Sequence, residues 1–495
     1  MSLLARLALT SIGCTLIGAC GSGAPVSFSA ESVIPAVPGH GAVARLEDWP
    51  EFGLDPQRSD SSALSSGITA ANIAHLRRRG VTLPGTVDSS PIYLHGVSVA
   101  GALRNVIVLS TTYGKTLAID ADSARILWTF TPAGYRRWAG SAQITTATPL
   151  ADPDRAFVYA ASPNGLIHKL SLADGHEASG WPVRITLDPT HEKIAAALNI
   201  DGEDVLAATG GYLGDAPPYQ GHLVAIDRAS AHILAVYNTL CSNRRRLLVP
   251  SSCPASDSAI LSRSGAVVEP GGQRILLDTG NGPWNGRTNF GDSALELTLP
   301  GLRLRQEFTP TDQEQLNGSD TDLGSSAPAL LGEDRVVLAG KDGIMRVLSL
   351  SRLDGRSPSA GHRLGGEVQT LTIPGGGQLF SAPAVWRQGA HTTMFVADEN
   401  ATGAYVMRGG RLRLAWENAH PGTSPVMVGG LLYVYDPAAG GIYVYRAASP
   451  RPIAKLQGQP GHWNSPIVVD SHVIEPEGDA NEHMLTGALE IFSAR

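Results

Sequence analysis

The sequence predicts an all-β protein that folds as a single propeller of about eight four-stranded blades, with seven blades as the nearest alternative. Three observations lead to this prediction: a recurring Pro motif, a strand with alternating apolar residues in each repeat, and a composition suited to tight turns. Gly (56) and Pro (33) are abundant, whereas charged residues make up only 17% of the chain. A length of 495 residues ordinarily indicates more than one domain, but radial repetition lets a propeller grow without one thick core.

The recurring motif is a small residue followed by Pro and a β-rich run. Adjacent clear copies are about 40 to 60 residues apart, which is a period expected of propeller blades. Two degenerate copies, near Ala195 and near Gly265, fill the long gap between Pro149 and Pro328. The clear copies contain Pro91, Pro149, Pro328, Pro383, Pro425 and Pro466.

Each repeat also contains a run in which apolar residues alternate with others. This period of two is what a half-buried strand requires. Counting these runs gives the estimate of about eight blades. They are residues 116–120, 167–170, 222–227, 294–297, 345–348, 404–407, 442–445 and 489–492.

The first repeat is the most explicit. Residues 113–120 (YGKTLAID) lead through a turn to Leu127 and Trp128. Asp120 can accept hydrogen bonds from backbone groups of the turn, and Trp128 can fill the gap between blades, as can Trp416. This unit resembles the repeat of quinoproteins that bind pyrroloquinoline quinone (PQQ), and the resemblance extends from about residue 49 to residue 492.

The N-terminus has the pattern of an export signal. An apolar stretch of about a dozen residues follows Arg6, which is too short to span a bilayer. Residues 17–20 (IGAC) resemble the bacterial lipobox, which implies a signal in residues 1–20, lipidation at Cys20, a tether in residues 21–47 and a propeller in residues 48–495. An ordinary signal peptide cleaved nearby is the alternative. The expected location is the cell envelope, held by a lipid and not by a membrane-spanning helix.

Two cysteines, Cys241 and Cys253, lie in a loop-like stretch of the predicted propeller. In an oxidising compartment, cysteines at this spacing most simply form a disulfide that closes the loop. A metal site would need further Cys or His residues close by, and the sequence has none there. The sequence therefore predicts a Cys241–Cys253 disulfide.

Three polar segments are unusual for blade strands: residues 278–285 with 290–293, residues 320–324 and residues 340–343. In PQQ-dependent alcohol dehydrogenases, a Thr-Gly-Asn turn supplies a Ca²⁺ ligand, a later Asp acts as the base, and a basic residue before a Gly turn contacts the quinone. The resemblance therefore implies Asn281 and Asp320 as Ca²⁺ ligands, Asp320 as the base with Asp322 as the fallback, and Lys341 as the quinone contact. Such oxygen ligands suit Ca²⁺, and an Asp can remove an alcohol proton.

The chain also departs from that family. It has no adjacent Cys pair, and Arg263 stands at about the place where the family stacks a Trp on the quinone. Asp215 is the best local substitute for the Glu that completes the Ca²⁺ shell, and Asp292 is a further candidate near the cofactor. An alternative interpretation is that these Asn, Asp and Gly residues form ordinary turns.

Two functions of different classes remain open at this point. One is an envelope quinoprotein that uses PQQ and Ca²⁺ to oxidise an alcohol or sugar and passes electrons to a separate protein, since no haem-attachment motif is present. The other is a non-catalytic propeller that binds an envelope protein or a small-molecule ligand, similar to the lipoprotein of outer-membrane protein assembly. A net charge of −7 without long basic runs disfavours nucleic-acid binding.

The predicted site is a funnel at the centre of the ring, with Asn281, Asp292, Asp320, Asp322 and Lys341 near its mouth. Two further charged segments, residues 191–193 and 475–477, have the composition of solvated turns.

Overall fold

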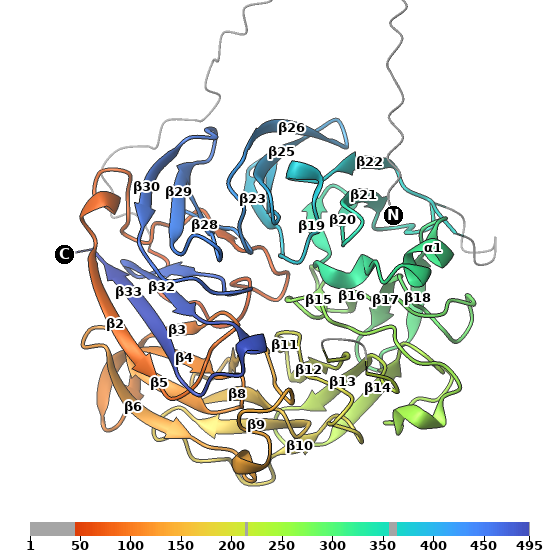
Figure 1. Cartoon of the computed structure of the whole chain (residues 1–495), viewed down its shortest axis with the longest axis horizontal. Helices are drawn as coiled ribbons and strands as arrows, with labels where there is room; N and C mark the ends of the chain where they lie inside the picture. The colour runs from red at the N-terminus through yellow and green to blue at the C-terminus, as the bar shows by residue number, and fades with distance from the viewer. Residues whose placement is uncertain (1–44, 213–215, 356–363, 495) are drawn as a thin grey trace, which may run out of the picture. The chain divides into compact units, whose positions relative to one another are not determined.

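A computed structural model describes residues 45–212, 216–355 and 364–494. Its strands form eight sheets arranged around a common centre, and every sheet has at least four strands (Figure 1). This confirms the predicted all-β propeller and its eight blades. The predicted signal, the tether up to residue 44 and Cys20 lie outside the described residues.

We number the blades 1 to 8 in chain order. Blades 1 to 3 are β3–β6 (Ile92–Val99, Ala102–Ser110, Thr116–Asp120, Arg125–Phe130), β7–β10 (Leu150–Ala151, Phe157–Ser162, Leu166–Ser171, Val183–Arg184) and β11–β14 (Asn199–Asp201, Asp204–Ala208, His222–Asp227, Ile233–Asn238). Blades 4 to 6 are β15–β18 (Val267–Val268, Arg274–Asp278, Ala294–Thr298, Leu304–Phe308), β19–β22 (Ala329–Gly332, Arg335–Leu338, Ile344–Ser349, Gln369–Thr372) and β23–β26 (Ala384–Gln388, His391–Ala397, Thr402–Arg408, Arg411–Asn418).

The last two blades contain strands from both ends of the described chain. Blade 7 is β27–β30 (Val426–Val428, Leu431–Tyr435, Ile442–Arg446, Pro452–Leu456), and β1 (Ser61–Ser62) pairs in parallel with β27. Blade 8 is β31–β33 (Ile467–Val469, His472–Glu477, Gly487–Ser493), with β2 (Arg77–Leu83) antiparallel to β33. Figure 1 shows β2 beside β33, so the last strand of the described chain closes the ring against an early segment.

The clear copies of the repeat motif mark the beginning of the first strand in six of the eight blades. Pro91 and Pro149 directly precede β3 and β7, and the other four motif prolines directly precede β19, β23, β27 and β31. Proline suits this place because it lacks the N–H that a strand interior needs for pairing. The eight alternating runs form the third strand of each blade: β5, β9, β13, β17, β21, β25, β29 and β33.

Three residues with predicted structural roles act between and within blades. Trp128 of blade 1 is buried and its indole N–H donates to the carbonyl of Leu172 in blade 2 at 2.9 Å. Trp416 of blade 6 likewise donates to Ala447 at 2.8 Å, so both side chains fill gaps between neighbouring blades. Asp120 Oδ1 accepts the N–H of Ser123 at 2.7 Å, which confirms its role in the turn.

Helices are short and few in the described part of the chain. The α-helix α1 (Gln313–Gly318) lies between blades 4 and 5, and 3₁₀ turns occur at Ile73–His75, Tyr135–Arg137, Pro250–Ser252, Leu323–Ser325, Pro374–Gly376 and Ala480–Glu482. None of the helices in the described residues has the length and apolar character that crossing a membrane requires.

Cys241 and Cys253 form the predicted disulfide, which closes the loop after β14. Both cysteines are buried together with Leu240 and Leu248. Closing a loop of this size removes conformational freedom from the unfolded chain, which stabilises the folded protein by about 3 kcal/mol.

We therefore expect replacement of both cysteines by Ser to lower the free energy of unfolding by up to about 3 kcal/mol. Urea unfolding of the wild type with and without a thiol reductant checks this result. A reduced wild type as stable as the oxidised protein would contradict it.

Candidate functional site

The centre of the ring is filled from within by residues 45–66, which we call the N-terminal belt. Its Phe52 packs against three alanines that lie two residues before the first strands of blades 3, 5 and 6. Backbone bonds attach the belt to six of the blades. They join Trp49 to Tyr93, Pro50 to Ala151, Pro56 to Val268, Ser59 to Val385, Asp60 to Met427 and Leu46 to Asp470.

A buried arginine holds the belt in place. Arg58 forms an ion pair with Glu51 at 2.7 Å, and both side chains are almost completely buried. Arg58 also donates to the carbonyls of Leu198 at 2.7 Å and Ser264 at 3.1 Å, which lead into blades 3 and 4. The belt thus ties together the loops that lead into the blades.

A pocket of about 270 Å³, which we call the axial pocket, lies among such loops. Its walls come from the loops that lead into blades 6, 7 and 8 and from turns of blades 6 and 7. These segments lie at residues 378–381, 421–424, 461–463, 397–399 and 436–438. Arg263, which precedes blade 4, completes the wall. The pocket therefore collects residues from blades that are far apart in the sequence.

Stacked rings form one side of the axial pocket. Trp463 stacks on Phe380 with ring centroids 5.1 Å apart and on His462 with centroids 4.0 Å apart. The guanidinium of Arg263 lies 4.9 Å from the Trp463 ring centre. The family resemblance implies a Trp at the position of Arg263. Arg263 is not aromatic, but its guanidinium contacts an aromatic ring from another loop.

Asp88, which precedes blade 1, organises this side of the pocket. Its carboxylate accepts a hydrogen bond from the Arg263 guanidinium at 2.9 Å and contacts His462 Nδ1 at 2.7 Å. It also accepts the backbone N–H groups of Trp463 and Ala480 at 3.1 Å each. Burial raises the pKa of Asp88, but Arg263 and His462 more than offset this effect, and the pKa lies well below its usual value. Asp88 is thus a buried anion with four donors.

Within the described residues, one group of side chains has the spacing of metal ligands: Asp88, His462 and Asp479, whose donor atoms lie within 4.8 Å of one another. Both Asp88 oxygens already accept two hydrogen bonds each, and the adjacent guanidinium of Arg263 repels a cation. The group therefore serves as an ion-pair network. Sequence analysis did not find it, because its members are brought together only by the ring.

The structure brings Asn281, Asp322 and Lys341 together at the boundary of blades 4 and 5. The backbone N–H of Asn281 donates to Asp322 Oδ1 at 2.8 Å, and Lys341 Nζ lies 2.5 Å from Asp322 Oδ2. Asp320 is 59% exposed in its side chain and lies 3.5 Å from Lys341 Nζ. A Cβ at Gly280 would lie only 2.3 Å from Asp322 Oδ1, so the close approach of this turn requires glycine.

Charge balance explains the state of this cluster. Burial lowers the pKa of Lys341, but Asp322 and Asp320 raise it more, and the pKa lies above its usual value. Lys341 therefore stays protonated, and its positive charge offsets negative charge on the carboxylates around it. Neither these residues nor Asp292 lines the axial pocket, whereas Arg263 does.

Asp292 is fully buried beside this cluster. Its Oδ1 accepts the N–H of Leu323 at 3.1 Å, and no described residue donates to its Oδ2. Burial raises its pKa to about 8, with a further contribution from the charge of Asp322. Asp292 is thus largely protonated at neutral pH. Asp215 lies outside the described residues.

We expect Asp292→Asn to stabilise the protein at pH 8. Between about pH 4 and pH 8 folded Asp292 holds a proton that the unfolded chain has lost, so its contribution to stability falls as the pH rises. Asn mimics the protonated acid, and the gain at pH 8 is at most about 5 kcal/mol. Urea unfolding at pH 5 and pH 8 measures this gain, and equal gains at the two values would contradict the assignment.

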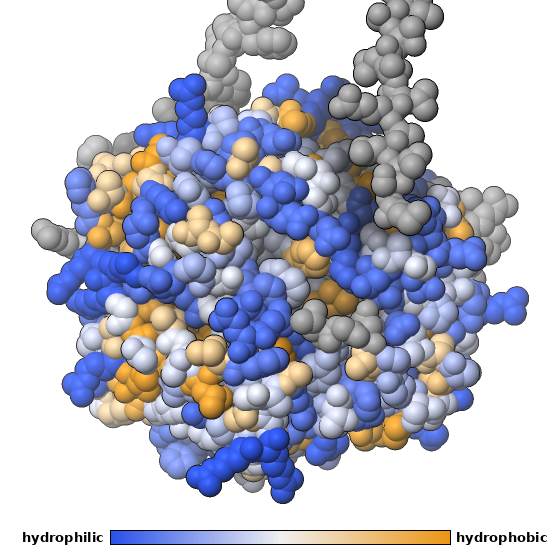
Figure 2. Space-filling view, in the orientation of Figure 1, coloured by the Kyte–Doolittle hydropathy of each residue, from blue (hydrophilic) through white to orange (hydrophobic). Residues whose placement is uncertain are grey.

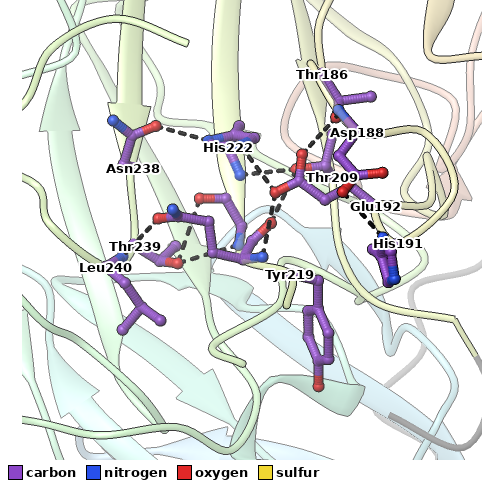
Figure 3. A network of polar contacts seen from close by, with 12 residues as sticks. Thr186, Asp188, His191, Glu192, Thr209, Tyr219, His222, Asn238, Thr239 and Leu240 are labelled. Carbon is purple, nitrogen blue, oxygen red and sulfur yellow. Dashed lines mark hydrogen bonds and ion pairs between the residues drawn. The ribbon is translucent and has the colours of Figure 1, made fainter. Parts of the chain in front are cut away.

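A second buried network lies between blades 2 and 3 (Figure 3). His222 Nε2 lies 2.9 Å from Glu192 Oε1, and both side chains are fully buried. His222 Nδ1 contacts Asn238 Oδ1 at 2.6 Å, and Asn238 donates to carbonyls of the disulfide loop, at Arg244 and Arg246. The prediction that residues 191–193 form a solvated turn is therefore wrong for Glu192. The network anchors the disulfide loop.

The second expected solvated turn is also wrong. Residues 475–477 lie within β32, and both glutamates are buried. Burial raises the pKa of Glu475 far above its usual value, so it is a neutral acid. Charged residue types alone do not reveal such burial.

No family model and no curated protein sequence matches the chain. Solved structures do resemble it. The chain superposes on the quinohemoprotein alcohol dehydrogenase of Comamonas testosteroni with a TM-score of 0.64 and 16% identity, covering 92% of this chain and 82% of the other. It superposes on a europium-containing methanol dehydrogenase with a TM-score of 0.65 and 13% identity, covering 90% of this chain and 98% of the other. It superposes on BamB of Moraxella catarrhalis with a TM-score of 0.52 and 11% identity, covering 85% of this chain and 98% of the other. At these identities the similarity establishes the eight-bladed propeller that this chain shares with quinoprotein dehydrogenases and BamB.

Proposed function

We propose that the protein is a cell-envelope binding propeller that holds a small molecule in the axial pocket. The observation that carries this proposal is the pocket itself, which has stacked rings on one side and polar groups from five loops. Concave, largely apolar sites with a few convergent polar groups are the usual binding sites for small molecules. The function is binding, and no catalytic step is assigned to any residue.

A PQQ and Ca²⁺ centre, which the resemblance implies, does not fit these residues. Lys341 supplies a positive charge 2.5 Å from Asp322 and 3.5 Å from Asp320, at the place where Ca²⁺ would be needed. Arg263 replaces the ring under the quinone, and Asp88 holds its guanidinium in place. Three carboxylates, Asp398, Glu399 and Asp436, also line the axial pocket and would repel a quinone that carries carboxylates.

A scaffold that binds an envelope protein is the other alternative. On the face of the ring shown in Figure 2, hydrophobic residues form small patches separated by hydrophilic ones. Protein-binding surfaces usually have a larger continuous apolar patch. This face therefore supports ligand binding better than protein binding.

Location in the cell envelope is part of the proposal. A disulfide between Cys241 and Cys253 suits an oxidising compartment outside the cytoplasm. Lipidation of Cys20 would hold the propeller at a membrane through the predicted tether. Mass spectrometry of the purified full chain tests the anchor, and a mature N-terminus other than lipidated Cys20 would overturn it.

Binding can be tested with 2-phenylethanol, a neutral probe with one ring and one hydroxyl, by saturation-transfer NMR. We expect saturable binding that is lost in Ala438→Trp, because Ala438 is exposed at the pocket wall and Trp would fill the space. Ala229→Trp is the matched control, since Ala229 is also exposed and occupies the same place after the turn aspartate Asp227. Binding that survives Ala438→Trp would show that the probe binds elsewhere.

The quinone alternative is tested by titrating the protein with PQQ, with and without Ca²⁺, while absorbance and melting temperature are followed. A ligand that binds only the folded state must raise the melting temperature. We expect no saturable effect. Saturable, Ca²⁺-dependent binding that disappears in Lys341→Ala and Asp320→Ala would overturn the binding-only proposal in favour of a quinoprotein.

A further inference from the structure

The charges on the wall of the axial pocket are not balanced. Arg263 and His462, the basic residues that line it, both pair with Asp88. Asp398, Glu399 and Asp436 also line the pocket. Among the described residues, no Lys, Arg or His forms an ion pair with any of these three carboxylates. The pocket therefore carries an excess of negative charge.

Two of these carboxylates are more than nine-tenths buried. Asp436 is 5% exposed, and its Oδ1 accepts the N–H groups of Ala438 at 3.1 Å and Ala439 at 2.9 Å. No described residue donates to Asp436 Oδ2, although the residue lines the pocket. Asp436 Oδ2 keeps contact with solvent at the pocket wall, where a donor that enters the pocket can reach it. This oxygen points to a donor that comes from outside the chain.

Asp398 has a similar position one blade earlier. It is 2% exposed, and its Oδ1 accepts the N–H groups of Asn400 at 2.8 Å and Ala401 at 2.7 Å. Its Oδ2 has only a long contact of 3.4 Å with the N–H of Gly377. Burial raises the pKa of Asp398, and no neighbouring cation opposes this effect. In both aspartates, Oδ1 thus accepts two hydrogen bonds from the residue's own turn, whereas Oδ2 has at most one long hydrogen bond.

The rest of the pocket wall contains apolar side chains beside the polar Gln378, Ser381, Thr423 and Ser424. Phe380, Pro421 and Pro437 line it together with the edge of the ring stack. A molecule that satisfies the whole pocket needs an apolar body and a charged hydrogen-bond donor. An ammonium group has three donors and the required charge.

We propose that the axial pocket selects a small amine, whose ammonium group binds Asp398 and Asp436 and whose apolar body lies against Phe380 and the two prolines. This inference rests on the proposed function, because it names the ligand class of the same pocket. Neutral and anionic ligands of the same shape bind less well, since they leave the two carboxylates unpaired or repelled.

The test compares three probes that share a phenyl ring and a short chain: 2-phenylethylamine, 2-phenylethanol and 3-phenylpropanoate. We expect the amine to bind the wild-type protein at least about tenfold more tightly than the alcohol, because a charge-assisted hydrogen bond adds more than 1.4 kcal/mol. The carboxylate should bind most weakly. Calorimetry and NMR titration at pH 7 provide the dissociation constants.

Substitutions then locate the effect. Asp436→Asn keeps the acceptor for Ala438 and Ala439 but removes the charge, so it should weaken amine binding about tenfold and leave alcohol binding unchanged. Asp398→Asn is the second variant, and it should act in the same way. The matched control is Asp227→Asn, because Asp227 Oδ1 accepts the N–H of Ser230 at 2.6 Å in a turn outside the pocket.

The outcomes separate this inference from the proposed function. Equal affinity for the three probes, or amine binding unaffected by both Asn variants, would overturn the amine assignment while pocket binding stands. Failure of all three probes to bind would overturn the proposed function and the inference together. Tighter binding of the anion would reverse the charge assignment and favour an anionic ligand.

Discussion

Replacement of Arg58 by Ala is expected to lower the free energy of unfolding by about 3 to 5 kcal/mol, because it leaves a buried partner without its counter-charge. Arg58 and Glu51 are 1% and 4% exposed in their side chains and 2.7 Å apart. Burial raises the pKa of Glu51 to about 7 even with Arg58 beside it. Without Arg58, Glu51 would have to take up a proton, and the carbonyls of Leu198 and Ser264 would lose a donor.

Glu51→Gln is the informative control for this prediction. Gln keeps an acceptor for Arg58, and Arg58 keeps its three carbonyl acceptors at Phe52, Leu198 and Ser264. We therefore expect a smaller loss than for Arg58→Ala. Guanidinium unfolding of the two variants and the double variant measures the coupling. If Arg58→Ala unfolds at the wild-type midpoint, the belt does not hold the ring in the way described here.

Asp88→Ala is the second variant with a large expected effect, again about 3 to 5 kcal/mol, since it leaves Arg263 buried without its anion. Arg263 is 8% exposed in its side chain, and Asp88 is 1% exposed. Four groups, on three separate segments, also lose their common hydrogen-bond acceptor. They belong to Arg263, to the neighbours His462 and Trp463, and to Ala480. The pocket wall should loosen, so probe binding should be lost together with stability.

The pH dependence of stability provides an independent measurement. Because the pKa of folded Asp88 lies below that of the unfolded chain, its stabilising contribution is present above about pH 4 and is lost as the pH falls towards the folded value. The difference in stability between wild type and Asp88→Asn should therefore shrink below about pH 4. A difference that stays constant from pH 7 to pH 3 would contradict the assigned ion pair.

The candidate site was predictable only in part. Asn281, Asp322 and Lys341 could be selected from short local motifs, and the structure does bring them together. Their roles towards a cofactor remain untested predictions. Arg263 could be selected only as a departure from a pattern, and its partner Asp88 had no signal at all. A carboxylate that accepts hydrogen bonds from four donors looks, in a sequence, like any other turn aspartate.

The sequence by itself determined the architecture, because its signals are local. A Pro before each clear first strand, a period of two in each third strand and paired cysteines in one loop are readable within a few residues, and repetition multiplies them into eight blades. Only the tertiary structure decided the pocket and the buried acids. Arg263 reaches Asp88 across 175 positions and His462 reaches it across 374, and such distances are closed by the ring and not by any sequence pattern. Burial, which makes Asp292 and Glu475 neutral acids, is likewise a property of the packed blades.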